Sequence, residues 1–294
     1  MRRVRQNIIA LVYDFDGTLT PKAMQEYTLL LALGVRENRA FWLAVNNESI
    51  TKREEKDFVW MRRIIEEADK EKKHITKDYF TKQGRGIKYF PGVESFFNKV
   101  NQYVKRKSKN KMKIRHYIVS SGLKEILNGI SIRNKFANVF GSEYHYDHHG
   151  CPFFPKVVIT DTVKTQYLFR INKGKENIGE SINEYMPEEQ RPIPFKNIIY
   201  IGDGLTDVPA MNVTKKNGGY AIAVYKPWYR KGLRTCKKLL NAGRVHFIAH
   251  ADYRKGSALF KYIICTLDKI IEQYKFDKFL IRHHSKLKKK LYGR

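Results

Sequence analysis

The chain has 294 residues, of which 57 are Lys or Arg and 29 are Asp or Glu, so its formal net charge is +28. Hydrophobic residues make up 42% of the chain and aromatic residues 13%, which excludes a chain that is disordered throughout. Its three cysteines, Cys151, Cys236 and Cys265, lack the paired spacing of a disulfide framework or a thiolate zinc site.

The first residues do not have the sequence pattern of a targeting segment. Arg2, Arg3 and Arg5 precede a short apolar stretch that runs directly into Asp14 and Asp16. A cleavable signal has a different pattern. No segment reaches the roughly 18 uncharged apolar residues of a bilayer span. We therefore expect a soluble, cytoplasmic protein without membrane association.

Several short apolar runs predict a layered α/β architecture. Residues 7–13 are branched and aromatic without polar alternation, which is typical of a strand buried on both faces of a parallel sheet. Helical patterns separate several of the runs that follow. These further predicted strands are 116–119, 156–159, 197–201, 220–225 and 245–248.

Between about residues 22 and 83, helical periodicity replaces the strand pattern. A first helix is predicted from Ala23 to Leu33, ending at Gly34. A later helix is predicted from apolar residues spaced three and four apart, namely Phe58, Met61, Ile64, Ile65 and Ala68. The return to the sheet is marked by Gly84, Gly86, Pro91 and Gly92.

These patterns divide the chain into a core, an insert and a C-terminal segment. We expect the α/β core at residues 1–21 and 84–260, and a helical insert at residues 22–83. Residues 261–294 are predicted as a helix followed by a tail, because Lys278 to Arg294 contains no acid. We expect this basic tail to be frayed.

The first chemical motif is Asp14-Phe15-Asp16-Gly17-Thr18, directly after the first strand. Side chains two residues apart on an extended chain can point the same way. Two carboxylates at such a short separation need a cation or a proton between them. Mg²⁺ prefers oxygen ligands such as carboxylates. The alternative is turn and helix-capping chemistry without a metal.

The second motif is Gly202-Asp203-Gly204-Leu205-Thr206-Asp207, again after a buried strand. Asp203 would complete a metal site with Asp14 and Asp16. Asp207 would ligate the metal, hold a metal-bound water, or only favour a helix N-terminus.

Two elements between these motifs offer groups that bind phosphate. Ser120-Ser121-Gly122 ends a predicted strand before a helical pattern, which would present a hydroxyl and backbone N–H groups at a helix start. Lys164 would supply a positive charge. Taken singly, Ser120 also reads as an ordinary N-cap, and Lys164 is one lysine among many.

In this order, the motifs resemble those of the haloacid dehalogenase-like phosphohydrolases, particularly the branch that includes phosphoserine phosphatase. The resemblance covers about residues 7–260 and includes the sequences at 89–94 and 251–257. It implies a doubly wound Rossmannoid parallel sheet with a helical cap inserted between the first two motifs. It also implies a magnesium-dependent phosphatase acting on a small phosphorylated substrate.

The resemblance assigns a role to each motif residue. Asp14 matches the nucleophile that forms an aspartyl-phosphate, and Asp16 matches the general acid and base. Lys164 and the Ser120-Ser121-Gly122 segment match the groups that hold the phosphoryl oxygens. Asp203 matches the metal-binding acid and Asp207 its supporting neighbour. The predicted Mg²⁺ ligands are Asp14, Asp16, Asp203 and Asp207.

The sequence does not identify the substrate. Phosphoserine phosphatases grip the amino acid with a cap glutamate and arginine, and Glu26, Arg62 and Arg63 are available here without a matching pattern. Gly17 stands where those enzymes usually have serine. The aromatic residues of the insert either line a substrate pocket or pack in the core. They are Trp42, Phe58 and Trp60.

Two alternatives stay open. An aspartyl-phosphate can pass to an acceptor other than water, as in a phosphotransferase or phosphomutase. The basic clusters at residues 2–5, 105–115 and 278–294 would also suit a nucleic-acid-binding relative that acts on nucleic-acid phosphate ends, or weak salt-dependent polyanion binding. A lysine-rich solvated surface explains the same clusters without a partner.

Overall fold

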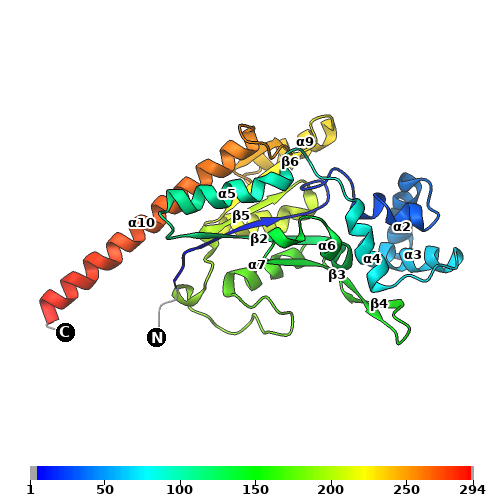
Figure 1. Ribbon diagram of the computed structural model, residues 1–294, viewed down its shortest axis with the longest axis horizontal. Coiled ribbons are helices and arrows are strands. Elements are labelled where there is room, and N and C mark those ends of the chain that lie inside the picture. The colour runs from blue at the N-terminus through cyan, green and yellow to red at the C-terminus, as the bar shows by residue number, and fades with distance from the viewer. Residues whose placement is uncertain (1–4, 293–294) are drawn as a thin grey trace.

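The computed structural model describes residues 5–292 and contains one seven-stranded sheet (Figure 1). Arg2, Arg3 and Arg294, which belong to the predicted basic clusters, lie outside the described residues. The strand order is β4-β3-β2-β1-β5-β6-β7, and every neighbouring pair is parallel except β3 and β4. The strands are β1 Ile8–Tyr13, β2 Lys113–Leu123, β3 Asn138–Tyr146, β4 Pro152–Val157, β5 Ile198–Gly202, β6 Tyr220–Tyr225 and β7 Phe247–His250.

The sheet separates two hydrophobic clusters, one on each face. Ile9, Leu11 and Tyr13 of β1 belong to one cluster, whereas Ala10 and Val12 belong to the other. This alternation follows from the period of two along a strand. Helices α5 Val93–Lys107 and α10 Ala258–Tyr292 contribute to the first cluster. The second includes residues of α7 Val163–Lys173, α8 Val208–Lys216 and α9 Arg230–Asn241. The doubly wound α/β fold predicted from the sequence is thereby confirmed.

Two strands at one edge of the sheet differ most from the prediction, while β2 extends beyond the predicted 116–119 and β7 lies two residues after the predicted 245–248. β3 was not predicted, because Gly141, Ser142 and Glu143 interrupt its apolar run although most of the strand is buried. β4 covers Pro152–Val157 rather than 156–159, and it pairs with β3 in antiparallel orientation at the sheet edge. An edge strand with a partly exposed face lacks the continuous apolar run that identifies a central parallel strand.

The chain between β1 and α5 is helical. It consists of η1 Met24–Glu26, α1 Leu29–Ala32, α2 Asn38–Lys52, α3 Lys56–Lys70, α4 Lys77–Gln83 and η2 Gly84–Gly86. In Figure 1, α2, α3 and α4 lie together at one end of the molecule, beside β3 and β4. The hydroxyl of Tyr144 in β3 donates to the carbonyl of Met61 in α3 at 2.8 Å. The helices therefore pack directly against the sheet.

Two expectations within this segment are wrong in detail. Residues 23–33 form two short helices rather than one, because Thr28 leaves the helical conformation with φ −139°. Gly34 does end α1, with φ +79°. Met61, Ile64 and Ala68 are buried as predicted, but Phe58 is 44% exposed and α3 also buries Val59 and Trp60. The buried face is rotated because α3 packs against both α2 and β4.

The C-terminal segment is one continuous helix, α10, up to Tyr292. The frayed tail predicted after residue 277 is therefore wrong for the backbone that the structure describes. Residues 278–292 contain no glycine or proline and many Lys and Leu, which favour a helix. The end of α10 extends away from the sheet in Figure 1.

The remaining elements connect the strands. They are α6 Lys124–Gly129, η3 Arg133–Lys135, η4 Glu188–Gln190, η5 Phe195–Asn197 and η6 Leu205–Asp207. Among the helices described, none combines the length and the apolar character that crossing a bilayer requires.

Candidate active site

The predicted motifs meet at the carboxyl edge of three adjacent parallel strands. Tyr13 of β1 is in register with Ile118 of β2 and with Ile201 of β5. Asp14, Ser120 and Asp203 follow these positions by one or two residues, so they emerge at the same edge. The basic segment 105–115 leads into the amino end of β2, at the opposite edge of the sheet.

Lys164, in the first turn of α7, joins two buried carboxylates. Its Nζ atom donates to Asp14 Oδ1 at 2.9 Å and to Asp207 Oδ1 at 2.7 Å. Lys164 is 2% exposed and Asp207 is fully buried. Burial would favour the neutral amine, but the two carboxylates outweigh it and hold the pKa of Lys164 well above its usual value. The lysine is therefore a fixed positive charge beside Asp14.

Both oxygens of Asp207 are already engaged by protein donors. Besides Lys164, Oδ1 accepts from the hydroxyl of Tyr200 at 2.7 Å. Oδ2 accepts from the backbone N–H groups of Asp203 at 3.1 Å and Gly204 at 3.4 Å. Asp207 therefore holds both Lys164 and the loop that carries Asp203.

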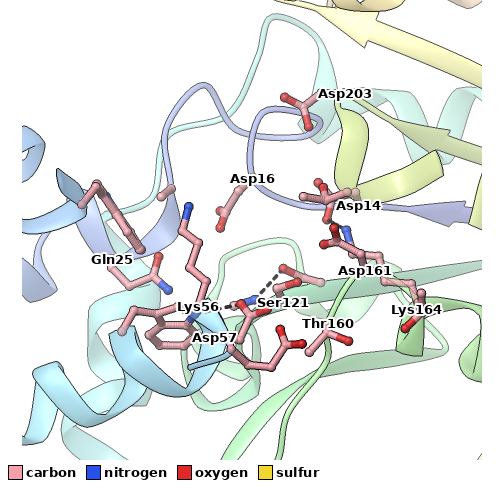
Figure 2. A pocket seen from close by; sticks show the side chains of 18 residues that line it. Asp14, Asp16, Gln25, Lys56, Asp57, Ser121, Thr160, Asp161, Lys164 and Asp203 are labelled. Atoms are coloured by element: carbon pink, nitrogen blue, oxygen red, sulfur yellow. Dashed lines mark hydrogen bonds and ion pairs between the residues drawn. The ribbon is translucent and has the colours of Figure 1, made fainter. Parts of the chain in front are cut away.

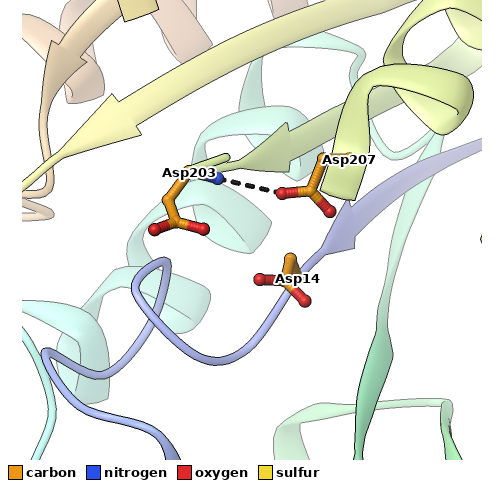
Figure 3. A group of neighbouring side chains, drawn as sticks. All are labelled: Asp14, Asp203 and Asp207. Atoms are coloured by element: carbon orange, nitrogen blue, oxygen red, sulfur yellow. Dashed lines mark hydrogen bonds between the residues drawn. The ribbon is translucent and has the colours of Figure 1, made fainter. Parts of the chain in front are cut away.

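Three of the four predicted metal ligands lie together. Carboxylate oxygens of Asp14, Asp203 and Asp207 lie within 4.8 Å of one another (Figure 3). Burial raises the pKa of Asp14 to about 6, and burial together with repulsion from Asp14 raises that of Asp203 well above its usual range. This arrangement fits Mg²⁺, because a hard divalent cation with oxygen ligands would relieve the repulsion between buried carboxylates.

Asp16 stands apart from this carboxylate group. Its Oδ1 atom accepts from the backbone N–H of Met24 at 2.8 Å, at the start of the helical segment. Burial, reinforced by the charge of Asp14, raises the pKa of Asp16 well above its usual value. A carboxyl group in these surroundings is suited to carry a proton.

Gly17 allows the two acidic loops to approach each other. Its φ angle is +79°, and a Cβ atom there would lie 2.1 Å from Asp203 Oδ2. A side chain at this position would be strained and would displace the Asp203 carboxylate.

The Ser120-Ser121-Gly122 segment is extended, because β2 continues to Leu123. The predicted order of strand and helix is correct, because α6 begins at Lys124 directly after β2. Any backbone donors from residues 120–122 nevertheless come from extended chain. The N–H of Gly122 donates to Ser120 Oγ at 3.0 Å. All three residues line the cavity that also contains Asp14 and Lys164.

This cavity has a volume of about 570 Å³ and is shared by the sheet edge and the helical segment (Figure 2). Trp42 and Trp60 line it, as the pocket interpretation predicted, but Phe58 does not. Sequence reasoning missed several other lining residues, of which only Thr206 lies within a motif. They are Gln25, Glu55, Lys56, Asp57, Thr160, Asp161, Thr162 and Thr206, together with Ala23.

The residues available for gripping phosphoserine lie elsewhere. Glu26 accepts from the indole N–H of Trp42 at 2.8 Å. Arg62 pairs with Glu48, Glu54 and Glu66, and Arg63 pairs with Glu48. None of Glu26, Arg62 and Arg63 lines the cavity.

Comparison with known proteins identifies relatives of this chain. The sequence model of the haloacid dehalogenase-like hydrolases matches residues 11–212. An uncharacterized protein of Borreliella burgdorferi is 30% identical over 292 residues, which cover 88% of this chain and 96% of that protein.

Solved structures show the same fold at low sequence identity. A probable phosphoserine phosphatase from Vibrio cholerae matches with a TM-score of 0.57 at 12% identity, covering 92% of this chain and 68% of that one. A phospho-aspartyl intermediate analogue of phosphoserine phosphatase matches with a TM-score of 0.54 at 14% identity, covering 87% and 98%. A hydrolase of the haloacid dehalogenase family from Salmonella enterica matches with a TM-score of 0.53 at 16% identity, covering 83% and 67%.

Proposed function

The chain belongs to the haloacid dehalogenase-like hydrolases, and we propose that it is a magnesium-dependent phosphatase that acts on a small phosphate monoester. The observation that carries this proposal is the buried Asp14, held by Lys164 at 2.9 Å, at the wall of an open cavity. A carboxylate in that position is oriented for attack on a phosphorus atom bound in the cavity.

Asp14 is the proposed nucleophile. In the first step its carboxylate oxygen attacks phosphorus, the bond to the alcohol oxygen breaks, and an aspartyl-phosphate forms. Water then attacks the phosphorus and releases inorganic phosphate. Lys164 stabilises the negative charge on the transferring group in both steps, together with donors from Ser120 and Ser121.

Asp16 is the proposed general acid and base. Burial and the charge of Asp14 raise the pKa of Asp16, which favours the protonated form that delivers a proton to the departing alcohol oxygen. The resulting carboxylate then accepts a proton from the water that attacks the aspartyl-phosphate. The N–H of Met24 fixes the orientation of this carboxyl group.

We assign Mg²⁺ to Asp14 and Asp203. When bound, it neutralises the repulsion between an anionic nucleophile and a dianionic phosphate. We revise the roles of the two other predicted ligands. Both oxygens of Asp207 are occupied, so we assign it to position Lys164 and the Asp203 loop. Asp16, outside the group of clustered carboxylates, serves proton transfer.

We propose that the helical segment between β1 and α5 is the cap and that residues 1–21 and 84–260 form the catalytic core. What supports this division is the composition of the cavity wall. Gln25, Trp42, Lys56, Asp57 and Trp60 all come from the helical segment and line the cavity. In Figure 2, Gln25 and Lys56 lie across the cavity from Asp14. The cap would therefore contact the alcohol portion of the substrate.

Phosphate release from a panel of small monoesters by the full chain tests the proposal. We expect turnover with Mg²⁺ that EDTA abolishes and that the Asp14→Asn variant lacks, although that variant stays folded. Hydrolysis by Asp14→Asn at the wild-type rate would exclude the assigned nucleophile. Added alcohol acceptors separate hydrolysis from phosphotransfer, because transfer would yield a new ester at the expense of free phosphate.

A further inference from the structure

The cavity is acidic, in contrast to the basic chain as a whole. Of the described residues that line it, six are carboxylic acids and two are lysines. Asp14, Asp16 and Asp203 belong to the catalytic edge, where Lys164 and the proposed metal offset them. The remaining acids, Glu55, Asp57 and Asp161, face the single remaining cation, Lys56. The part of the cavity beyond the phosphate therefore has an excess of negative charge.

Asp57 is the most enclosed of these three acids. It lies in the first turn of α3, and its Oδ1 atom accepts one hydrogen bond, from Trp60 Nε1 at 2.9 Å. It forms no ion pair with any of the side chains that the structure describes, those of residues 5–287. Burial raises its pKa, and the charge of Asp161 adds to this, while Lys164 and Lys56 act in the opposite direction. A positive ligand group would satisfy this carboxylate.

Gln25 supplies a second, independent indication of a ligand. It lines the cavity but is only 2% exposed, and its Oε1 atom has no hydrogen-bond partner. A buried acceptor without a donor costs free energy until a ligand supplies one. In Figure 2, Gln25 and Lys56 lie on the side of the cavity opposite Asp14 and Lys164. The ligand group expected there is a hydrogen-bond donor.

The aromatic wall is compatible with a cation. The ammonium of Lys56 lies 5.9 Å from the centre of the Trp42 ring, so this wall already faces one positive charge. Lys56 itself is exposed, as is Glu55, whereas Trp60 is buried beside Asp57. The indole faces would contact the carbon atoms next to a ligand ammonium.

On the premise that the protein is a phosphatase, we propose that its substrate is the phosphate ester of an amino alcohol, with the ammonium group bound by Asp57 and Gln25. An ammonium carries three donors, which matches an unpaired carboxylate and an unpaired amide oxygen. No arginine among the described residues lines the cavity, and Arg62 and Arg63 are paired with glutamates. The alcohol therefore carries no carboxylate, which distinguishes it from phosphoserine.

The test compares two esters of similar size, O-phosphoethanolamine and 2-hydroxyethyl phosphate, which differ in having an ammonium or a hydroxyl group. We expect kcat/KM to favour O-phosphoethanolamine by about tenfold or more, the usual effect of one charge-assisted hydrogen bond. Asp57→Asn should bring the ratio of the two values close to one. Asp69→Asn, at an exposed position of the same helix, is the matched control and should keep the wild-type ratio.

A third ester and a binding measurement complete the design. If O-phosphoserine is the better substrate and Lys56→Met removes that advantage, the assignment of an alcohol without a carboxylate is overturned. Calorimetric titration of the Asp14→Asn variant with the same esters measures ammonium selectivity without turnover. Equal affinity or equal kcat/KM for the two matched esters overturns the inference and leaves the phosphatase proposal standing. Selective binding without hydrolysis of any ester by the wild type overturns the phosphatase proposal and retains the ammonium site.

Discussion

The ammonium of Lys164 lies 2.7 Å from a carboxylate oxygen of Asp207, and neither side chain is appreciably exposed. The two residues are 43 positions apart in the sequence. Asp14 shares the same ammonium at 2.9 Å, so a single buried lysine balances two buried acids. Buried charges of this kind are tolerated only while they are paired.

We therefore expect Lys164→Met to destabilise the metal-free protein as well as abolish turnover. Removal of one partner from a buried ion pair costs about 3–5 kcal/mol of unfolding free energy. Urea denaturation with EDTA present measures the loss. Lys237→Met, at an exposed lysine of α9, is the control and should change stability by at most about 0.5 kcal/mol. Equal stability of the two variants would show that the Lys164 pairs contribute nothing.

Asp203 should determine the affinity for Mg²⁺. Its carboxylate belongs to the group that fits the metal, and among the described residues no protein donor hydrogen-bonds to it and would compete. Calorimetric titration should show Mg²⁺ binding by the wild type and at least about tenfold weaker binding by Asp203→Asn. Asp78→Asn, which removes an exposed acid of α4, should bind as the wild type does. Undiminished binding by Asp203→Asn would place the metal elsewhere.

Asp16 should matter most where the departing alcohol needs a proton. p-Nitrophenol leaves readily without one, whereas an alkyl alcohol does not. With Asp16→Asn we expect a burst of p-nitrophenol close to one per active site, because the aspartyl-phosphate forms but its hydrolysis lacks a base. Alkyl phosphates should give neither burst nor turnover. Rapid-mixing absorbance measures the burst, and an equal rate loss for both ester types without a burst would argue against this role.

We expect Gly17→Ser to impair the protein because its side chain would collide with Asp203, and Gly243 provides a control for backbone strain alone. Gly17 and Gly243 both have positive φ, but a Cβ atom at Gly17 would meet Asp203, whereas Gly243 has nothing within 4 Å. Gly17→Ser should therefore lower both kcat/KM and Mg²⁺ affinity. Gly243→Ser bears the same kind of backbone strain, about 1 kcal/mol, and should retain both. If both variants lost Mg²⁺ affinity to the same extent, backbone strain alone would explain the loss in Gly17→Ser.

We expect His116 to lower the free energy of unfolding as the pH falls below 6.5. It is buried between Tyr13 and Asn101, and burial lowers its pKa from 6.5 to about 3. Between pH 6.5 and about 3, His116 therefore takes up a proton in the unfolded chain but not in the folded protein. The stabilising contribution of neutral His116 is present above pH 6.5 and is lost as the pH falls toward about 3.

The variant His116→Gln removes this titration. Relative to that variant, the wild type should lose about 2 kcal/mol of unfolding free energy between about pH 7 and pH 5. The comparison cancels the contributions of Asp14, Asp16 and Asp203, whose raised pKa values act in the opposite sense. A pH-independent difference in urea denaturation would mean that the pKa of His116 is the same in the folded and unfolded states.

Much of the sheet and of its catalytic edge could be predicted from local sequence. β1 and β5 are central strands buried on both faces, so each appears as a continuous apolar run followed at once by acidic residues. Parallel strands place such endings at one edge of a sheet. Asp14 and Asp203 could therefore be assigned to one site without knowledge of the fold.

The strand β3 and the buried face of α3 could not be predicted in the same way. Gly141 and Ser142 lie in β3 because the strand runs beside β2, not because of their own preference. The rotation of α3 that exposes Phe58 depends on its contacts with α2 and β4. Local periodicity contains no information about neighbours that are distant in sequence.

The sequence by itself determined which chemical groups this protein has available, because carboxylates that follow adjacent parallel strands emerge at the same edge of the sheet. Only the tertiary structure decided how those groups are used. In the folded protein, both carboxylate oxygens of Asp207 accept hydrogen bonds from protein donors, and Asp16 accepts one from the N–H of Met24. Asp57 and Gln25 line the same cavity. Each outcome depends on packing between segments far apart in the chain, and long-range packing sets both the position and the protonation of a buried group.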